Sequence, residues 1–246
     1  MKDYSNLINL KNKFLEIRHC IPDKTLTSFA EAFDVEYTHN STAIEGNTLS
    51  LLQTKAVIED GISVGGKTLR EIYEVVNHSK AYNYVKKCIA EQLPLSEKIV
   101  KEIHFMLMNN IIIGGIYRNE DVLISGAEHI PPTPNQMYNQ IKNFYLDLNE
   151  KALDPINLAA WTHAEFVKIH PFLDGNGRTS RLIMNFQLMS HGFLPVSIAK
   201  ENRLEYFESL EEYALRGDIE PFADIIADLE EQRLTRFINS TRKECV

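Results

Sequence analysis

The stretch HPFLDGNGRTSR, residues 170–181, is the part of the sequence that decides its interpretation. A histidine, an acid, two glycines around an asparagine and two arginines fall within these twelve residues. Apolar residues with helical spacing precede the stretch over 158–169 and follow it over 179–190, where Gly192 supplies a stop. The spacing therefore predicts a loop between two helices that carries chemically active side chains.

The glycines and arginines of this stretch favour a phosphate site. Gly175, Asn176 and Gly177 can turn successive backbone N–H groups toward an anion, and the positive end of the following helix dipole adds to the attraction. Arg178 and Arg181 are three residues apart on that helix, so both guanidinium groups can reach the same polyphosphate.

The remaining polar side chains suit chemistry on such a phosphate. Asp174 directly precedes the glycines, where a carboxylate could hold a magnesium ion together with phosphate oxygens and water. His170, at the end of the preceding helix, offers a base with an ordinary pKa of about 6.5, which can accept a hydroxyl proton. A buried corner followed by a simple helix-entry turn is the structural alternative.

Taken in full, residues 170–181 resemble the signature of the Fic family, with every functional position of that pattern filled. The resemblance implies that His170 deprotonates a Ser, Thr or Tyr hydroxyl of a target protein, which then attacks the α-phosphorus of ATP and expels pyrophosphate. It also implies that Asp174 holds Mg²⁺ on the α- and β-phosphates, and that Asn176 and the glycine amides bind the α-phosphate. Arg178 and Arg181 are expected to bind the β- and γ-phosphates.

A second segment, STAIEGN at residues 41–47, resembles the inhibitory motif of many Fic proteins. Helical spacing puts Ser41 and Glu45 on one face, where the serine can support the carboxylate. The resemblance implies that Glu45 pairs with Arg181 in the place of the γ-phosphate, so that ATP binds in a non-productive pose. An ordinary helix end, capped by Gly46 and with Glu45 in solvent, is the alternative. The inhibitory helix is expected at about 28–46.

Between residues 114 and 134, glycines and a proline pair bracket a short β-branched stretch of Val122, Leu123 and Ile124. This pattern predicts a small β-hairpin or extended flap. Residues 117–132 resemble the Fic flap, whose backbone pairs with an extended segment of the target. The resemblance implies that Val122, Leu123 and Ile124 bind the target and that Ile124 also borders the nucleotide. A plain surface hairpin is the alternative.

Helical periodicity covers most of the remaining chain and predicts an all-α fold. With the resemblance, this becomes a Fic-type helical bundle with a small β-hairpin flap beside the active site. We divide it into an N-terminal helical region over 1–95, a catalytic core over 96–195 and C-terminal helices over 196–246 that close the nucleotide pocket, all in one compact unit. Tyr206 is expected near adenine, with packing in the core as an equal alternative.

Residues 61–68, GISVGGKT, match the phosphate-binding pattern GxxxxGK followed by Ser or Thr. That motif requires a buried strand leading into it, whereas residues 51–60 have the pattern of a helix. A glycine-rich connection between two helices explains the same letters better, with Thr68 and Glu71 as a capping box at the start of the second helix.

Composition limits the class of protein. With 246 residues and 44% apolar content the chain can bury a substantial core, and a formal charge of -8 gives no attraction to nucleic acid or to anionic membranes. The widely spaced Cys20, Cys88 and Cys245 form no disulfide framework or zinc pair, and no leader or membrane-length segment stands out. These features indicate a cytoplasmic protein without nucleic-acid or membrane partners.

The sequence as a whole predicts a protein adenylyltransferase. It is expected to move AMP from ATP, with Mg²⁺, onto a hydroxyl side chain of a target protein docked on the flap, and to be restrained by Glu45. Two other functions stay open: a hydrolase that removes AMP with the same site, and a non-catalytic regulator that binds nucleotide. Self-modification and assembly into a homo-oligomer are also compatible with the sequence. The target, the modified residue and the signal that releases inhibition cannot be read from it.

Overall fold

The computed structural model describes residues 4–241 of the chain, and within that range every regular element is helical. The helices are α1 (Ser5–Arg18), α2 (Asp23–Ile44), α3 (Leu51–Glu59), α4 (Leu69–Ala90), α5 (Glu97–Met108), α6 (Pro134–Glu150), α7 (Pro155–Ile169), α8 (Asn176–Ser190), the 3₁₀ helix η1 (Lys200–Asn202), α9 (Arg203–Arg216) and α10 (Glu220–Thr241). The expected all-α class is confirmed for the described residues. None of their helices has both the length and the apolar character needed to cross a membrane.

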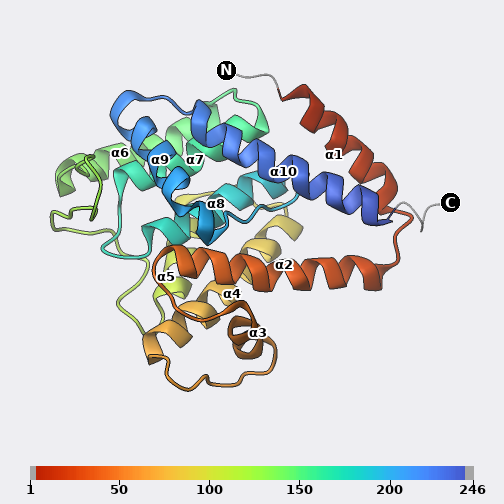
Figure 1. Cartoon of the computed structure of the whole chain (residues 1–246). Coiled ribbons are helices and arrows are strands. Elements are labelled where there is room, and N and C mark those ends of the chain that lie inside the picture. Colours follow the sequence, from red (N-terminus) through yellow and green to blue (C-terminus); the bar gives the residue numbers. More distant parts are fainter. Residues whose placement is uncertain (1–3, 242–246) are drawn as a thin grey trace.

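The helices α7 and α8 form the centre of the molecule and pack closely against each other. The helices α4 and α5 pack on α8, while α9 and α10 pack on α7 (Figure 1). Most residues of the two central helices are buried, and the rings of Phe144, Trp161 and Phe166 stack or meet edge to face between α6 and α7. Burial of such large rings supplies much of the apolar free energy that fixes α7, the helix that carries His170 at its end.

The start of α4 carries the side-chain cap that the sequence predicts. Thr68 Oγ1 accepts a hydrogen bond from the backbone N–H of Glu71, and the Glu71 carboxylate accepts one from the N–H of Thr68, which confirms the capping box. Residues 61–68 connect α3 to α4. Because a helix and not a strand leads into them, they are not a strand-loop-helix phosphate site.

The loop between α7 and α8 is shorter than the spacing predicts. The helix α7 ends at Ile169, and α8 begins at Asn176 instead of Thr179, because Gly175 takes a left-handed φ of 78° that turns the chain directly into the helix. Asn176 and Gly177 therefore belong to the first turn of α8, where backbone N–H groups have no carbonyl partner within the helix.

The helix α2 runs without a break from Asp23 to Ile44, so it starts earlier and ends slightly earlier than the segment 28–46 assigned to inhibition. Glu45 is the residue at its C-terminal cap, and Gly46 follows with a φ of 101°. The helix α2 contacts α8, and this contact carries Ser41 and Glu45 to the start of α8 (Figure 1).

The expected β-hairpin is wrong: residues 117–132 contain no strand, and none occurs elsewhere in residues 4–241. Side chains hold this segment in place of a ladder between strands. Glu211 accepts hydrogen bonds from the backbone N–H groups of Glu128 and His129, at 2.6 and 2.7 Å, and His129 Nε2 donates to the carbonyl of Lys168. The segment is therefore an anchored loop, and we call residues 117–132 the flap loop.

Candidate active site

His170 ends α7 in a left-handed conformation with a φ of 51°, which is unusual for a residue with a Cβ. Its ring Nδ1 lies 3.3 Å from the carbonyl oxygen of Val167. Because a carbonyl only accepts, Nδ1 carries the proton and Nε2 keeps a free lone pair. Burial lowers the pKa of His170 to about 4, so the ring is neutral at pH 7. This is the protonation state that a general base needs.

The backbone of His170 is held by Arg118, which the sequence patterns do not single out. Arg118 is 1% exposed, its Nε donates to the His170 carbonyl at 2.8 Å, and its own backbone N–H donates to the carbonyl of Pro171. The two Nη groups donate to the carbonyls of Glu120 and Pro132, near the two ends of the flap loop. One guanidinium group therefore joins the turn at His170 to the flap loop.

The turn before α8 is closed by Asn176 and His104. Asn176 Oδ1 accepts from the N–H of Phe172 at 2.9 Å, and Asn176 Nδ2 donates to the Phe172 carbonyl at 2.8 Å. The ring of His104, on α5, stacks on Phe172 with centroids 3.5 Å apart, and its Nε2 donates to the Asp174 carbonyl. Burial lowers the pKa of His104 to about 4, so this ring is neutral too. The side chain of Asn176, expected at the α-phosphate, is thus engaged with the turn itself.

The carboxylate of Asp174 lies between two arginines, Arg178 and Arg70. Oδ1 accepts from Arg178 Nη2 at 3.2 Å and from the N–H of Gly175 at 2.5 Å, while Oδ2 pairs with Arg70 of α4. Burial alone would raise the pKa of Asp174, but Arg178 and Arg70 hold it below its usual value. In residues 4–241 no three His, Cys, Asp or Glu side chains are arranged to hold a metal ion by themselves. An ionised single carboxylate does fit Mg²⁺ that arrives with phosphate oxygens and water.

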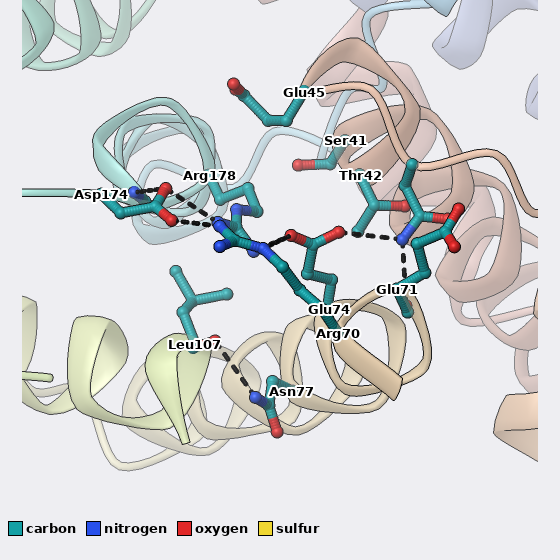
Figure 2. A network of polar contacts seen from close by, with 12 residues as sticks. Ser41, Thr42, Glu45, Arg70, Glu71, Glu74, Asn77, Leu107, Asp174 and Arg178 are labelled. Carbon is teal, nitrogen blue, oxygen red and sulfur yellow. Dashed lines mark hydrogen bonds and ion pairs between the residues drawn. The ribbon is translucent and has the colours of Figure 1, made fainter. Parts of the chain in front are cut away.

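Arg178 lies next to Asp174 and is 2% exposed. Its Nη1 is 3.7 Å from Glu74 Oε1, and the Glu74 carboxylate also accepts hydrogen bonds from Arg70 and Asn47. Figure 2 shows these contacts, with Arg70 between Glu74 and Asp174. Within the described residues, neither Nε nor Nη1 of Arg178 has a hydrogen-bond acceptor. Buried guanidinium donors without acceptors favour the binding of an anion.

Arg181 is also buried, but the protein itself satisfies its donors. Nε donates to Ser41 Oγ at 3.0 Å, and Nη2 donates to the Ser41 carbonyl at 2.7 Å and to Glu45 Oε1 at 2.8 Å. Nη1 donates to the Tyr206 hydroxyl at 3.2 Å, and this hydroxyl lies 2.9 Å from His163 Nε2. Burial would lower the pKa of Arg181, but Tyr206 and Glu45 raise it above its usual value. The hydrogen-bond partner of Ser41 is thus the Arg181 guanidinium and not, as expected, the Glu45 carboxylate.

The Glu45 carboxylate lies against the first turn of α8. A Cβ added to Gly177 would be 2.3 Å from Glu45 Oε1 and 3.2 Å from Arg181 Nη1, so glycine leaves the room that this carboxylate fills. The free N–H groups of a helix start and a guanidinium group are the surroundings that stabilise an anion. Glu45 therefore occupies an anion position of the site, although 35% of its side chain stays exposed.

Tyr206 packs in the core, which is the alternative to a position near adenine. Tyr206 is 1% exposed and its hydroxyl binds Arg181, so its ring presents no surface to a nucleotide in this structure. In the flap loop, Val122 and Ile124 are half-buried, whereas Leu123 is 80% exposed. The alternation is that of an extended chain, even though the segment has no strand partner.

Sequence reasoning missed the residues that support the site from other helices: Arg70, Glu74, His104 and Arg118. Arg70 and Glu74 have the spacing of an ordinary surface ion pair on a helix. His104 left a usable signal, since it is a polar residue between Ile103 and Leu107 on an apolar helix face. Such a residue needs a hydrogen-bond partner when buried, and here that partner is the site turn.

Known proteins resemble this chain in sequence. The profile of the Fic/DOC family matches residues 94–188, which include the stretch 170–181. Over 211 residues the chain is 37% identical to Protein adenylyltransferase Fic of Drosophila persimilis, a similarity that covers 84% of this chain and 41% of that protein. The chain thus spans less than half the length of the curated relatives that it matches.

Solved structures match nearly the whole chain. A Fic-1 chain from C. elegans is 31% identical, with a TM-score of 0.83, over 96% of this chain and 70% of that one. A Fic domain containing signaling protein from Bacteroides thetaiotaomicron is 26% identical, with a TM-score of 0.88, over 97% of both chains. The structural similarity therefore extends well beyond the residues that the family profile matches.

Proposed function

The chain belongs to the Fic family, and from that premise we propose that it is a protein adenylyltransferase, which transfers AMP from ATP to a hydroxyl side chain of a target protein. The observation that carries the proposal is the neutral His170 with a free Nε2, one short turn before a helix start that holds two buried arginines. A base and a polyphosphate site at one junction are the parts that nucleotidyl transfer requires.

In the proposed reaction, the target hydroxyl gives its proton to Nε2 of His170 while its oxygen attacks the α-phosphorus of ATP. The bond between the α-phosphorus and the bridging oxygen breaks, and pyrophosphate leaves with the electron pair. The hydrogen bond from Nδ1 to Val167 keeps the ring oriented while Nε2 takes the proton. Such a base contributes about a hundred- to ten-thousand-fold to the rate.

The phosphates are proposed to bind where the site has unpaired donors. Arg178 would bind the β- or γ-phosphate through its guanidinium group, and the N–H groups of Asn176 and Gly177 at the start of α8 would bind the α-phosphate. Asp174, ionised and with 34% of its side chain exposed, would hold Mg²⁺. When bound, that ion neutralises charge on the α- and β-phosphates. Asn176 would further contribute by closing the turn through Phe172.

Glu45 is proposed to inhibit the enzyme. Its Oε1 binds Arg181 and its carboxylate fills the space beside Gly177, so a γ-phosphate on Arg181 has to displace it. One buried guanidinium group cannot pair with a carboxylate and a phosphate at the same time without repulsion between the two anions. ATP could still bind through Arg178, but the α-phosphorus would not be aligned with His170 while Glu45 stays in place.

The flap loop is proposed to dock the target. The backbone from Asp121 to Ile124 makes no ladder within the described residues, and of its carbonyls only that of Ile124 accepts a backbone hydrogen bond, from Ala127. Its other N–H and C=O groups can therefore pair with an extended target segment. Arg118 ties the base of this loop to His170, which would bring the docked hydroxyl to the base. Val122 and Ile124 would line the side of the loop nearer the protein, and Leu123 would face the target.

One observation favours hydrolysis of an AMP-modified target as a second activity of the same site. Only Oε1 of Glu45 is paired with Arg181; its Oε2 has no hydrogen-bond partner in the described part of the chain, and the side chain is 35% exposed. A carboxylate so placed could orient a water molecule toward a phosphorus held by α8.

The test compares wild-type protein, Glu45→Gly and the double variant Glu45→Gly with His170→Ala, each given ATP labelled at the α-phosphate and an extract of its own cells. We expect Glu45→Gly to raise AMP transfer by about tenfold or more, because Arg181 becomes free for the γ-phosphate. The double variant should lose that transfer. Glu31→Gly, which removes an exposed acid of the same helix, is the matched control.

Mass spectrometry of the labelled proteins identifies the product as a gain of one AMP. No gain for Glu45→Gly would exclude the inhibitory role, and transfer by the double variant would exclude His170 as the base. Giving the AMP-modified product back to wild-type protein then tests hydrolysis, which Glu45→Gly should not perform.

A further inference from the structure

A cavity of about 390 Å³ lies between α1, α2, α4, α10 and the Gly192–Pro195 turn that follows α8. Figure 1 shows α1 and α10 side by side above α2, with this part of the molecule far along α2 from its Glu45 end. The walls are largely apolar, and their rings and thioether come from Phe14, Phe29, Phe33, Met189, Phe193 and Phe237. The volume is in the range of small-molecule sites, and none of these residues belongs to the proposed active site.

One cation of this cavity lies against an aromatic wall. The guanidinium of Arg233, on α10, stacks over the Phe33 ring with Cζ 3.5 Å from the centroid. Its Nε is buried without a hydrogen-bond acceptor, and within residues 4–241 Arg233 forms no ion pair with an acid. A stacked guanidinium with open Nη groups is preorganised to accept a carboxylate by two parallel hydrogen bonds.

The other charged residues around the cavity determine its net charge. Lys86 pairs with Asp34 at 2.5 Å, so these two lining residues neutralise each other. Glu230 lies one helical turn before Arg233 and accepts the N–H of Leu194, and burial raises its pKa to about 8, which favours its neutral form at pH 7. Glu36 is the remaining lining acid and is exposed, while the exposed Arg18 and Arg236 add positive charge at the rim. The unpaired charge of the cavity is therefore positive.

We propose that this cavity binds a small amphipathic anion, with an apolar chain against the aromatic walls and a single carboxylate on Arg233. Burial of the chain would supply most of the affinity, and the carboxylate would fix the orientation. The proposal does not rest on the proposed enzymatic function, because the cavity and the residues around His170 share no side chain.

The test is isothermal titration calorimetry with decanoate and with its neutral analogue decan-1-ol. We expect wild-type protein to bind one decanoate, and to bind decan-1-ol about tenfold or more weakly, since the alcohol cannot pair with the guanidinium. Arg233→Met should weaken decanoate to the level of decan-1-ol and leave decan-1-ol unchanged. Arg233→Lys, which keeps the charge, should retain part of the preference for decanoate.

Two further variants make the result specific to this cavity. Arg216→Met removes an exposed arginine of α9 that pairs with Glu212, and it should bind decanoate as wild-type protein does. Ala30→Phe puts a ring into the cavity from an exposed position of α2 and should abolish binding of both compounds. The proposal is overturned by any of three results: no decanoate binding to wild-type protein, equal affinity for acid and alcohol, or unchanged decanoate affinity in folded Arg233→Met.

Discussion

Arg178 and Arg181 lie one turn apart on α8 and are both buried, yet their surroundings differ in a way that separates two kinds of binding site. Every nitrogen of the Arg181 guanidinium donates a hydrogen bond, to Ser41, Glu45 or Tyr206. Arg178 donates only to Asp174, and its Nε and Nη1 have no acceptor among residues 4–241. The protein thus supplies hydrogen-bond acceptors to every guanidinium nitrogen of Arg181, whereas two nitrogens of Arg178 lack one, although Nη1 lies 3.7 Å from Glu74.

The difference indicates how a triphosphate would enter the site. A buried donor without a partner costs roughly 1–3 kcal/mol. A phosphate that accepts from Arg178 would recover part of this cost, although it has to approach a guanidinium group that is 2% exposed and lies beside Asp174 and Glu74. At Arg181 the same phosphate has to replace a carboxylate that comes from a helix 136 residues earlier in the chain. In the proposed function, Arg178 would contribute to the binding of ATP and Arg181 to its alignment.

The largest expected effect is on stability, and it should differ between the two arginines. Arg181→Met leaves Ser41, Glu45 and Tyr206 without their shared donor, and we expect the free energy of unfolding to fall by about 3 kcal/mol. Arg178→Met removes one bond to a partly exposed carboxylate but also removes two unpaired donors. We expect a change of less than about 1 kcal/mol for it. Urea unfolding followed by circular dichroism measures both.

Equal losses for the two variants would contradict the contrast, and so would a larger loss for Arg178→Met. The double variant of Arg181→Met with Glu45→Gln tests whether the stability lost in Arg181→Met comes from its ion pair with Glu45. Because both changes act on one ion pair, the combined loss should be smaller than the sum of the single losses.

Arg118 is a third buried arginine, and all of its bonds go to backbone carbonyls. It touches no substrate in the proposed reaction and acts by fixing the turn at His170. We expect Arg118→Met, in the Glu45→Gly background, to lower kcat by up to about a hundredfold, because a small displacement of a reacting group has an effect of that size. The KM for ATP should stay nearly constant, since Arg178 and the start of α8 are unchanged.

Arg118→Lys should restore part of kcat, because an ammonium group can still donate to the His170 carbonyl. Arg216→Met serves as the control for loss of an exposed arginine. A folded Arg118→Met variant with unchanged kcat, or one in which only the KM for ATP rises, would contradict a positioning role.

The contrast between the arginines also shows what could be predicted from the sequence. The stretch 170–181 was informative because a base, an acid, a turn and a helix start occur in consecutive residues, where short-range rules apply. The capping box at Thr68 and the helical periods are local in the same way. The pairing of Glu45 with Arg181 came only from the family resemblance, since nothing local links residues so far apart.

The errors have the opposite origin, because each depends on a contact between distant segments. The flap loop was expected as a hairpin from its β-branched residues, but its anchors are Glu211 and Arg118, which periodicity does not reveal. Tyr206 is found in the second of its two expected positions, packed in the core, and its contacts with Arg181 and His163 also join distant segments. Ser41 was placed on the correct helix face, but its partner there is the arginine of another helix and not its neighbour Glu45.

The smallest expected effect concerns His170, whose pKa is lowered by burial and raised to a smaller extent by the Glu45 carboxylate. The folded pKa is about 4, against a usual value of 6.5, so between these values the unfolded chain takes up a proton that the folded protein does not. His170 therefore destabilises the folded protein as the pH falls below 6.5 and has no such effect above it. Between pH 7 and 5.5, wild-type protein should lose about 1 kcal/mol more than His170→Asn, whose side chain tolerates a positive φ.

Urea unfolding at the two pH values measures this difference. The variant Glu45→Gly tests whether the carboxylate bound to Arg181 shifts the pKa of His170. Since Glu45 raises the pKa of His170 and burial lowers it, removal of the carboxylate should lower that pKa further. The additional loss between pH 7 and 5.5 should then be at least as large in Glu45→Gly as in wild-type protein. Equal losses for wild-type protein and His170→Asn would mean that the imidazole is not buried in its neutral form. A smaller loss in Glu45→Gly would mean that removal of the carboxylate raises the pKa of His170, which is the opposite of the expected direction.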